Sequence, residues 1–398
     1  MALYAGSLFW PGTLPATPAY PSLEADLDCE VLVAGGGVSG ALCAHYLVEA
    51  GLDVVLVERD RVAMGSSAVN TGILQYSNDT MLCEFLGRMP REDAVAIYRL
   101  CSEGLDELER ISRDLIDPTD FLRRDSIYFA SSREDVGKLL CEYSALSEHG
   151  FPVECLDHAR LMDRYGIDKP AALVTRGDAE VNPSKLIHAL IRHTAQSSRV
   201  FELTGVRSLE SGQTGVRVLT TGGSIRAKQV IFATGYAREN LPRLPGARLG
   251  LTYSAVSRPI PTDMLWPDGC MIWETARSYL YLRTTPDHRV IIGGLDEPRP
   301  EPGNDPAFLT AKGEVLLQEL KRLFPRIETE PEYLWAATFG DAQDGIPYFG
   351  VDPADPRVFY CLGYGGNGTV CSVVGARIIR DLLLKGHHPQ AHIFRLDR

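Results

Sequence analysis

The chain lacks any cysteine arrangement that would bind a metal or build a disulfide framework. It contains nine cysteines, an odd number, and no two of them are spaced as C-x-x-C. Zinc-binding motifs and redox dithiols need closely spaced pairs, and secreted disulfide-rich domains normally carry an even number. We therefore expect ordinary core thiols in a reducing compartment, and we predict a cytoplasmic protein without a metal site.

Excess positive charge is also missing. Asp and Glu total 52 against 40 Lys and Arg, so the formal net charge is −12. Nucleic acids and anionic membrane surfaces attract basic proteins, so we expect neither as a partner. The length of 398 residues exceeds what one hydrophobic core usually holds, so we expect two domains.

No apolar run is both long and continuous enough to cross a membrane. Two stretches without charged residues, Val31–Val48 and Val358–Ala376, have a suitable length, but each contains a cluster of glycines. A membrane helix needs about 20 consecutive apolar residues, so we interpret both as buried strand–turn–helix segments. The region up to residue 27 is rich in proline and has no basic residue before its apolar patch. We expect an extended leader there, and no signal peptide.

The strongest positive signal is a glycine-rich turn between an apolar run and a helical stretch. Gly35, Gly37 and Gly40 fit G-x-G-x-x-G after Val31–Val33, and a second apolar run ends at Glu58. The first glycine permits a tight bend, the second lets a pyrophosphate approach, and the third lets the helix pack against the strand. The helix N-terminus offers free N–H groups to the phosphates, and the acid can accept hydrogen bonds from a ribose. We predict dinucleotide binding, with a purely structural turn as the alternative.

Two further glycine turns follow buried apolar runs. One ends the run Val230–Gly235, and the other, Gly363–Gly368, opens a helical pattern that continues to Lys385. A second turn beside the nucleotide motif is typical of flavin-binding folds. Near a flavin, the terminal turn would place a positive helix end beside the N1–C2=O edge of the reduced ring. A core strand and a tight turn before a helix are the structural alternatives.

Nucleotide-type elements recur three times along the chain and are interrupted twice. We predict an α/β fold whose Rossmann-like domain is assembled from residues 28–80, 176–246 and 340–398. A second, α+β domain for the substrate is built from the two insertions, residues 81–175 and 247–339, after a leader at 1–27.

The patterns also predict individual elements. Helices are expected at Thr80–Gly87, Arg91–Ser112, Glu134–His149, Ser184–Gln196 and Ala311–Phe324. Strands are expected at Ser126–Ala130, Val200–Leu209 and Gly215–Thr220, and short strands at Tyr279–Arg283 and Arg289–Gly293.

In combination these motifs resemble the D-amino-acid oxidase-like (DAO) family of flavoproteins, which includes glycine, sarcosine and γ-glutamylputrescine oxidase-like members. The matching segments follow family order over nearly the whole chain: Val31–Gly40 with Glu58, Gly65–Gly72, Asn182-Pro183, Ala233–Gly235, Arg289–Gly294, Asp344–Pro347 and Gly363–Gly368. The resemblance implies a tightly held FAD in a Rossmann-like domain of the glutathione-reductase type.

The resemblance also implies which residues hold the cofactor. They are Gly35, Gly37, Val38, Ser39, Gly40, Glu58, Arg59, Gly65, Ser66, Ser67, Asn70, Thr71, Gly72, Val206, Ala233, Thr234, Gly235, Gly345, Ile346, Gly363, Gly365, Gly366, Asn367, Gly368 and Thr369. Some family members tether FAD through a cysteine, but no cysteine here matches such an attachment.

The reaction implied by the resemblance is oxidation of the C–N bond of an amine or amino acid. Hydride passes from the carbon that bears the amine to flavin N5, water hydrolyses the imine, and O2 is reduced to H2O2. A same-fold dehydrogenase that delivers electrons to a quinone or a protein remains an alternative, as do an NAD-dependent enzyme and a redox-inactive nucleotide-binding protein. No protein base is required if the amine binds neutral, so no catalytic histidine is predicted.

One departure from the family pattern concerns substrate binding. Glycine oxidase-like members carry a carboxylate-binding arginine five residues before the Asp of the DGxP motif, where this chain has Phe339. Either another cation binds a carboxylate or the substrate lacks one. Arg283 is the leading replacement, with a solvated arginine at a strand end as the equal alternative. Tyr253, Tyr281 and Tyr364 are further candidates for the pocket, with packing as their alternative role.

Overall fold

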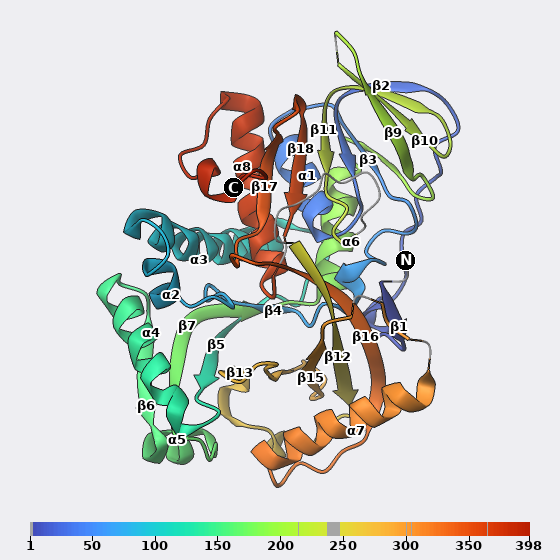
Figure 1. Ribbon diagram of the computed structural model, residues 1–398. Helices are drawn as coiled ribbons and strands as arrows, with labels where there is room; N and C mark the ends of the chain where they lie inside the picture. Colours follow the sequence, from blue (N-terminus) through green and yellow to red (C-terminus); the bar gives the residue numbers. More distant parts are fainter. Residues whose placement is uncertain (1–2, 214, 237–246, 300, 304, 364) are drawn as a thin grey trace.

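The computed structural model describes residues 3–213, 215–236, 247–299, 301–303, 305–363 and 365–398 (Figure 1). Two large sheets organise them, and their elements confirm the predicted α/β class with a Rossmann-like parallel sheet. No helix within these described ranges has the length and apolar character that a membrane span requires.

The apolar runs form the centre of the first sheet. Its strands follow the order β17-β18-β11-β2-β3-β8, with β10 and β9 continuing from β11. β18, β11, β2, β3 and β8 run parallel to one another, whereas β17 runs antiparallel to β18. The bounds are β2 (Leu27–Ala34), β3 (Val54–Val57), β8 (Arg199–Phe201), β9 (Val206–Ser211), β10 (Val216–Thr220), β11 (Ser224–Phe232), β17 (Tyr348–Asp352) and β18 (Asp355–Leu362).

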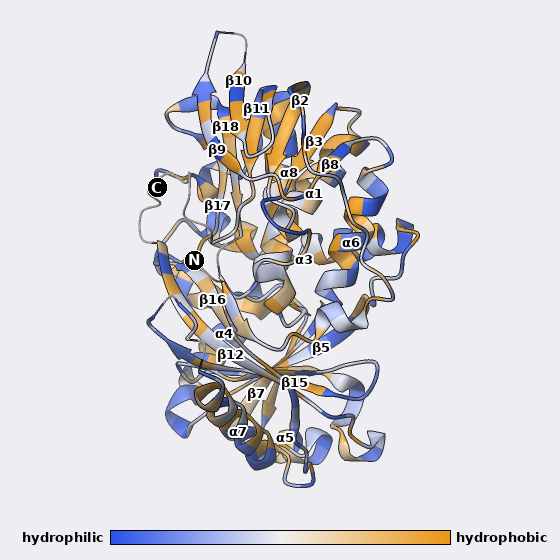
Figure 2. Ribbon diagram, turned by 90° about the vertical axis from the view of Figure 1, so that its right-hand side faces the viewer, coloured by the Kyte–Doolittle hydropathy of each residue, from blue (hydrophilic) through white to orange (hydrophobic). Residues whose placement is uncertain are grey.

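Alternate side chains of β2 enter two different cores. Val31 and Val33 pack with the helices α1 (Val38–Glu49), α6 (Pro183–Thr194) and α8 (Gly368–Lys385). Leu32 and Ala34 pack on the opposite face with side chains of β10. A strand that is buried on both faces has a continuous apolar sequence, and Figure 2 shows the apolar character of these strands.

The second sheet has ten strands in the order β1-β16-β12-β15-β14-β13-β5-β7-β4, with β6 paired to β7. Helix α7 (Pro306–Leu323) packs its buried leucines against β12, β15 and β16. The bounds are β1 (Tyr4–Gly6), β4 (Ile73–Leu74), β5 (Leu122–Phe129), β6 (Val153–Asp157), β7 (Ala171–Glu180), β12 (Ala247–Ser257), β13 (Met271–Glu274), β14 (Tyr281–Thr284), β15 (Val290–Glu297) and β16 (Pro331–Ala342).

The predicted helices are confirmed within a few residues. Besides α6 and α7, they are α2 (Leu82–Leu86), α3 (Arg91–Asp114) and α4 (Val136–Glu148), and α5 (His158–Tyr165) was not predicted. Helix α3 packs directly on α8, where a Cβ built on Gly104 would lie 3.5 Å from Val370 Cγ1.

One strand prediction is wrong. The run Val200–Leu209 is not one strand, because Leu203 has a φ of +53° and turns the chain between β8 and β9. The short strands predicted at Tyr279–Arg283 and Arg289–Gly293 are found as β14 and β15, but they lie in one sheet with two longer strands. β12 and β16 span 11 and 12 residues, and they pair along almost their whole length.

The proline-rich leader is more than an extended surface segment. Tyr4–Gly6 pairs antiparallel with β16 as an edge strand, so residues 4–6 lie beside residues 335–337 (Figure 1). Phe9 and Trp10 are buried, and the Trp10 indole donates a 2.6 Å hydrogen bond to the Asn70 carbonyl. The leader is therefore part of the core around Asn70.

The proposed domain boundaries stay a prediction. Two of them, at residues 176 and 340, fall inside the continuous strands β7 and β16. The prediction also assigns α3 to the substrate domain. In the structure α3 packs on α8, which follows the terminal glycine motif and was assigned to the cofactor domain.

Candidate functional site

A cavity of about 670 Å³ is lined by residues of both sheets. The parallel strands contribute their carboxyl ends, which carry Ala34, Val57 and Phe232. The second sheet contributes residues of β12, β13, β14, β15 and β16. Ligands of open α/β sheets bind outside the carboxyl ends of the strands, so this cavity is the candidate site.

The three glycines of the first motif have different surroundings. Gly35 has a φ of +119°, and a Cβ built on it would lie 2.4 Å from the Ala233 carbonyl oxygen. A Cβ on Gly40 would lie 1.8 Å from the Gly35 carbonyl oxygen. A Cβ on Gly37 would meet only the Ser67 hydroxyl, at 3.1 Å. The fold itself therefore requires Gly35 and Gly40, whereas Gly37 leaves its space to a ligand.

Two helices begin at the cavity. Helix α1 follows Gly37 and helix α8 follows Asn367, and neither of these residues caps its helix with a side chain. The Val38 N–H donates a 3.1 Å hydrogen bond to the Ser67 hydroxyl. The Ser39 and Ser372 hydroxyls lie 2.8 Å apart and join the first turns of the two helices. Free N–H groups and the helix dipole make such ends favourable for negative charge.

Glu58 lies at the end of β3 and lines the cavity. Its carboxylate accepts hydrogen bonds from the backbone N–H groups of Gly36, at 2.6 Å, and Asp60, at 2.9 Å. Burial raises the pKa of Glu58 above its ordinary value, and these hydrogen bonds oppose the rise. Two N–H donors leave lone pairs on the carboxylate for ribose hydroxyls.

Unsatisfied polar atoms in the wall fit a large polar ligand. Ser66 Oγ, Gln75 Nε2 and Thr234 Oγ1 are buried without a hydrogen-bond partner, and all three residues line the cavity. Buried polar groups normally have partners. Together with the space at Gly37 and the two helix ends, they fit FAD.

The structure brings most of the predicted cofactor residues together around this cavity. The exceptions are Gly40, Gly72, Gly345 and Ile346, which lie outside its lining. Gly72 faces away because a Cβ there would meet the Val181 carbonyl oxygen at 2.2 Å and Arg283 Nη1 at 2.6 Å. A Cβ on Gly345 would meet Thr80 Oγ1 at 2.2 Å. A cofactor role for these four residues stays a prediction.

At the other end the cavity is aromatic and acidic, and sequence reasoning missed most of this end. Tyr281 was predicted, whereas Asp79, Trp273, Tyr279 and Asp296 were not. The Tyr279 hydroxyl donates to Asp79 at 2.8 Å, and burial raises the pKa of Tyr281 to about 12. The walls of this end come from segments far apart in the chain. The only sequence pattern that pointed to it was therefore the alternation of side chains along β14.

The structure contradicts Arg283 as a carboxylate anchor. The side chain is 1% exposed and does not line the cavity. Its Nη1 donates to the carbonyls of Gly72 and Val181, each at 2.9 Å, and its Nε lies 3.6 Å from Glu180. Burial lowers the pKa of Arg283, and Glu180 opposes this shift. Its donors are thus engaged within the protein.

The other tyrosine candidates have different outcomes. Tyr253 is buried outside the cavity, where its hydroxyl accepts a 2.9 Å hydrogen bond from Arg299. The prediction for Tyr253 is therefore wrong, because the residue packs under α7. Tyr364 lies outside the described residues.

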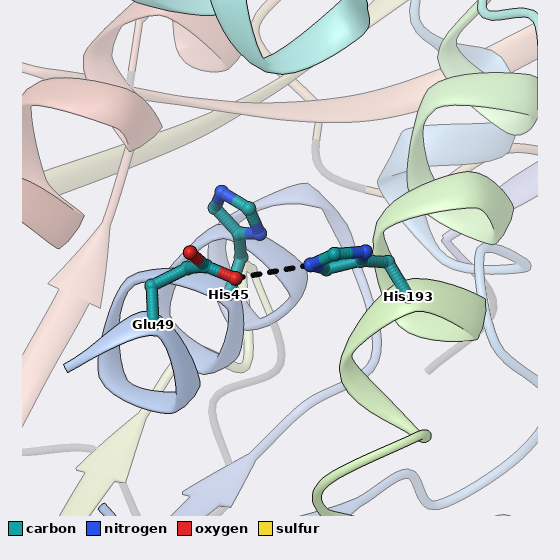
Figure 3. Close-up of side chains that lie close together, drawn as sticks. All are labelled: His45, Glu49 and His193. Carbon is teal, nitrogen blue, oxygen red and sulfur yellow. Dashed lines mark hydrogen bonds and ion pairs between the residues drawn. The ribbon is translucent and has the colours of Figure 1, made fainter. Parts of the chain in front are cut away.

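One group of side chains in the described part of the chain could hold a metal ion. His45 and Glu49 of α1 face His193 of α6 (Figure 3), and their candidate ligand atoms lie within 4.8 Å of one another. His193 Nε2 lies 3.0 Å from Glu49 Oε1, and burial lowers the pKa of His45 to about 4. None of the three lines the cavity, and the absence of a metal stays a prediction.

Comparison with known proteins agrees with this geometry. Residues 30–382 match the DAO family, described as FAD dependent oxidoreductase. The γ-glutamylputrescine oxidoreductase of Escherichia coli (strain K12) is 27% identical and covers 92% of this chain and 85% of its own length. Glycine oxidase of Geobacillus kaustophilus (strain HTA426) is 25% identical, and the match covers 89% of this chain and 92% of that protein. The crystal structure of glycine oxidase from Geobacillus kaustophilus gives a TM-score of 0.79 at 22% identity, covering 93% of this chain and 99% of that chain.

The first prediction separates the glycine that faces the ligand from a glycine that the fold needs. Gly37→Val should give a folded protein that does not retain FAD, because its side chain would occupy the pyrophosphate space. Gly40→Val should not fold, because its Cβ overlaps the Gly35 carbonyl. Circular dichroism and flavin absorbance of the purified proteins measure both outcomes. A yellow Gly37→Val protein would contradict the assignment.

The second prediction concerns Glu58. Glu58→Ala should weaken FAD binding by about 1.5–3 kcal/mol, the usual value for hydrogen bonds to a charged acceptor, or roughly tenfold to a hundredfold in Kd. Glu30→Ala is the matched control, because Glu30 lies on the same sheet and pairs with Lys228 at the surface. Equal FAD affinity of the two variants, measured by titration of the apoproteins, would rule out the ribose role.

The third prediction is that Arg283 stabilises the fold and does not anchor a substrate carboxylate. Arg283→Met should lower the free energy of unfolding by about 3 kcal/mol, because it leaves the buried Glu180 with less compensation. The double variant Arg283→Met/Glu180→Gln should recover part of this loss. Urea denaturation of the holoproteins measures it. Unchanged stability together with a selective loss of carboxylated substrates would restore the anchor hypothesis.

Proposed function

The chain belongs to the DAO family of FAD-dependent oxidoreductases, and we propose that it oxidises a carbon–nitrogen bond of an amine or amino acid. One observation carries the proposal: a single cavity extends from the dinucleotide turn to the aromatic end formed by Trp273 and Tyr281. A substrate bound among these rings would share the cavity with the cofactor. The names of similar proteins, glycine oxidase and γ-glutamylputrescine oxidoreductase, support this substrate class.

Bound FAD would supply a hydride acceptor at flavin N5. The substrate carbon that bears the amine loses the hydride, its nitrogen loses a proton, and water hydrolyses the imine to a carbonyl compound and ammonia or an amine. The two electrons then reduce O2 to H2O2. As the sequence predicts, Glu58 would bind the ribose of FAD, and Gly37–Ser39 would bind its pyrophosphate.

The chain contributes binding and orientation to this reaction. The N-terminus of α8, beside Gly363 and Gly368, would stabilise negative charge at one edge of the ring. The described residues of the cavity wall include no histidine and no lysine, which supports a mechanism in which the amine binds neutral and needs no strong protein base. All nine cysteines are free thiols, so we also propose a cytoplasmic location.

The fourth prediction tests the reaction in two stages. The anaerobic holoprotein is mixed with a panel of amines and amino acids, and at least one should bleach the visible absorbance of the oxidised flavin. Admission of air should then restore the absorbance and release one equivalent of H2O2 for each flavin. Bleaching without peroxide would identify a dehydrogenase that needs a quinone or protein acceptor. Failure of every C–N compound to bleach the flavin would refute the proposal.

A further inference from the structure

We infer that the substrate is an amine whose chain ends in a second positive charge, and that the acidic and aromatic end of the cavity binds this charge. The inference rests on the proposed function, because it names the substrate class for the same cavity. The residues that carry it are Asp79, Asp296, Trp273, Tyr279 and Tyr281, and all of them line the cavity.

Among the described residues, neither carboxylate forms a salt bridge, although the charge of Arg277 acts on Asp296. Asp79 accepts hydrogen bonds from the Gly366 N–H, at 2.9 Å, and from the Tyr279 hydroxyl, at 2.8 Å. Asp296 lies near the end of β15. Burial raises its pKa and Asp79 adds to the rise, whereas a hydrogen bond with Thr252 and the charge of Arg277 oppose it. The next residue, Glu297, pairs with both Arg299, at 2.8 Å, and Lys312, at 2.7 Å. Burying acidic groups without compensation is costly, and a bound cation would provide that compensation.

Aromatic rings complete the wall around these carboxylates. The Trp273 and Tyr279 rings are 6.2 Å apart in an edge-to-face arrangement, and the Tyr279 and Tyr281 rings are 5.8 Å apart. The Tyr281 hydroxyl lies 3.3 Å from the Thr252 hydroxyl. Ring faces attract ammonium and guanidinium groups, and the attraction strengthens when water is excluded. Carboxylates and rings therefore favour the same ligand charge.

The described residues of this wall offer a substrate carboxylate no cation at the aromatic end. Among the described lining residues, the one basic side chain is Arg59, which follows Glu58 at the dinucleotide end, and Phe339 lines the substrate end. Outside the lining, Arg277 is a basic group that acts on Asp296. It is exposed, lies over the Tyr279 ring at 5.0 Å and donates to the carbonyls of Ala276 and Asp79, each at 3.1 Å. An acidic substrate would thus face two carboxylates.

The fifth prediction compares three four-carbon amines that differ only at the far end: diaminobutane, butylamine and aminobutyrate. The diamine should have the highest kcat/KM, and aminobutyrate the lowest. Asp296→Asn should reduce the ratio of diamine to butylamine by about tenfold to a hundredfold, because it removes a partly buried charge partner while keeping the shape. Glu297→Gln, outside the cavity, is the matched control and should leave this ratio unchanged.

A second measurement does not depend on turnover. A bis-quaternary ammonium analogue of the diamine has no nitrogen lone pair to drive oxidation, so it should act as a bound ligand. It should raise the thermal unfolding midpoint of the holoprotein, and the shift should fall clearly in Asp296→Asn. An equal shift in both proteins would exclude Asp296 as the binding group.

The outcomes separate this inference from the proposed function. If aminobutyrate or an α-amino acid is the best substrate and Arg277→Ala abolishes its oxidation, the charge preference is wrong while C–N oxidation stands. If butylamine and the diamine react equally well in the unmodified protein, the inference also fails. If no C–N compound reduces the flavin, the proposed function itself fails.

Discussion

A buried arginine joins the parts of the chain that form the cavity wall. Arg283 lies on β14, yet its guanidinium binds carbonyls of the segment after Asn70 and of the end of β7, and it also lies 5.5 Å from the centre of the Trp10 ring. Removing a guanidinium from water is costly unless its donors are satisfied and its charge is compensated. Only an arrangement in which Glu180, Gly72 and the leader lie together meets that requirement. The position of the wall between the two sheets depends on this cluster.

Helix N-termini and carboxylates both line the cavity. Their separation is incomplete, because Glu58 lies at the dinucleotide end and Asp79 accepts a hydrogen bond from Gly366 beside α8. The helix N-termini would stabilise an anionic pyrophosphate, and Asp79 with Asp296 would stabilise a cationic amine.

The cofactor end could be predicted from the sequence, because its determinants are local. The bend at Gly35 and the packing of Gly40 depend on neighbouring residues, and Glu58 ends the next strand. The substrate end could not, because Asp79, Thr252 and Asp296 meet only through tertiary structure. The Arg283 prediction failed for a specific reason. Arg283 lies on the same face of β14 as Tyr281, which lines the cavity. At the position of Arg283, however, Trp10 and residues 71–72 cover this face. Strand alternation indicates a face and cannot show what covers it.

The contact between Ser39 and Ser372 spans 333 positions of the chain. During synthesis the first helix of the nucleotide motif therefore emerges long before its partner helix α8, and the edge strand β1 emerges equally long before β16. Contacts of such sequence separation form late in folding. A nascent chain therefore exposes the glycine turn long before α8 can pack beside it.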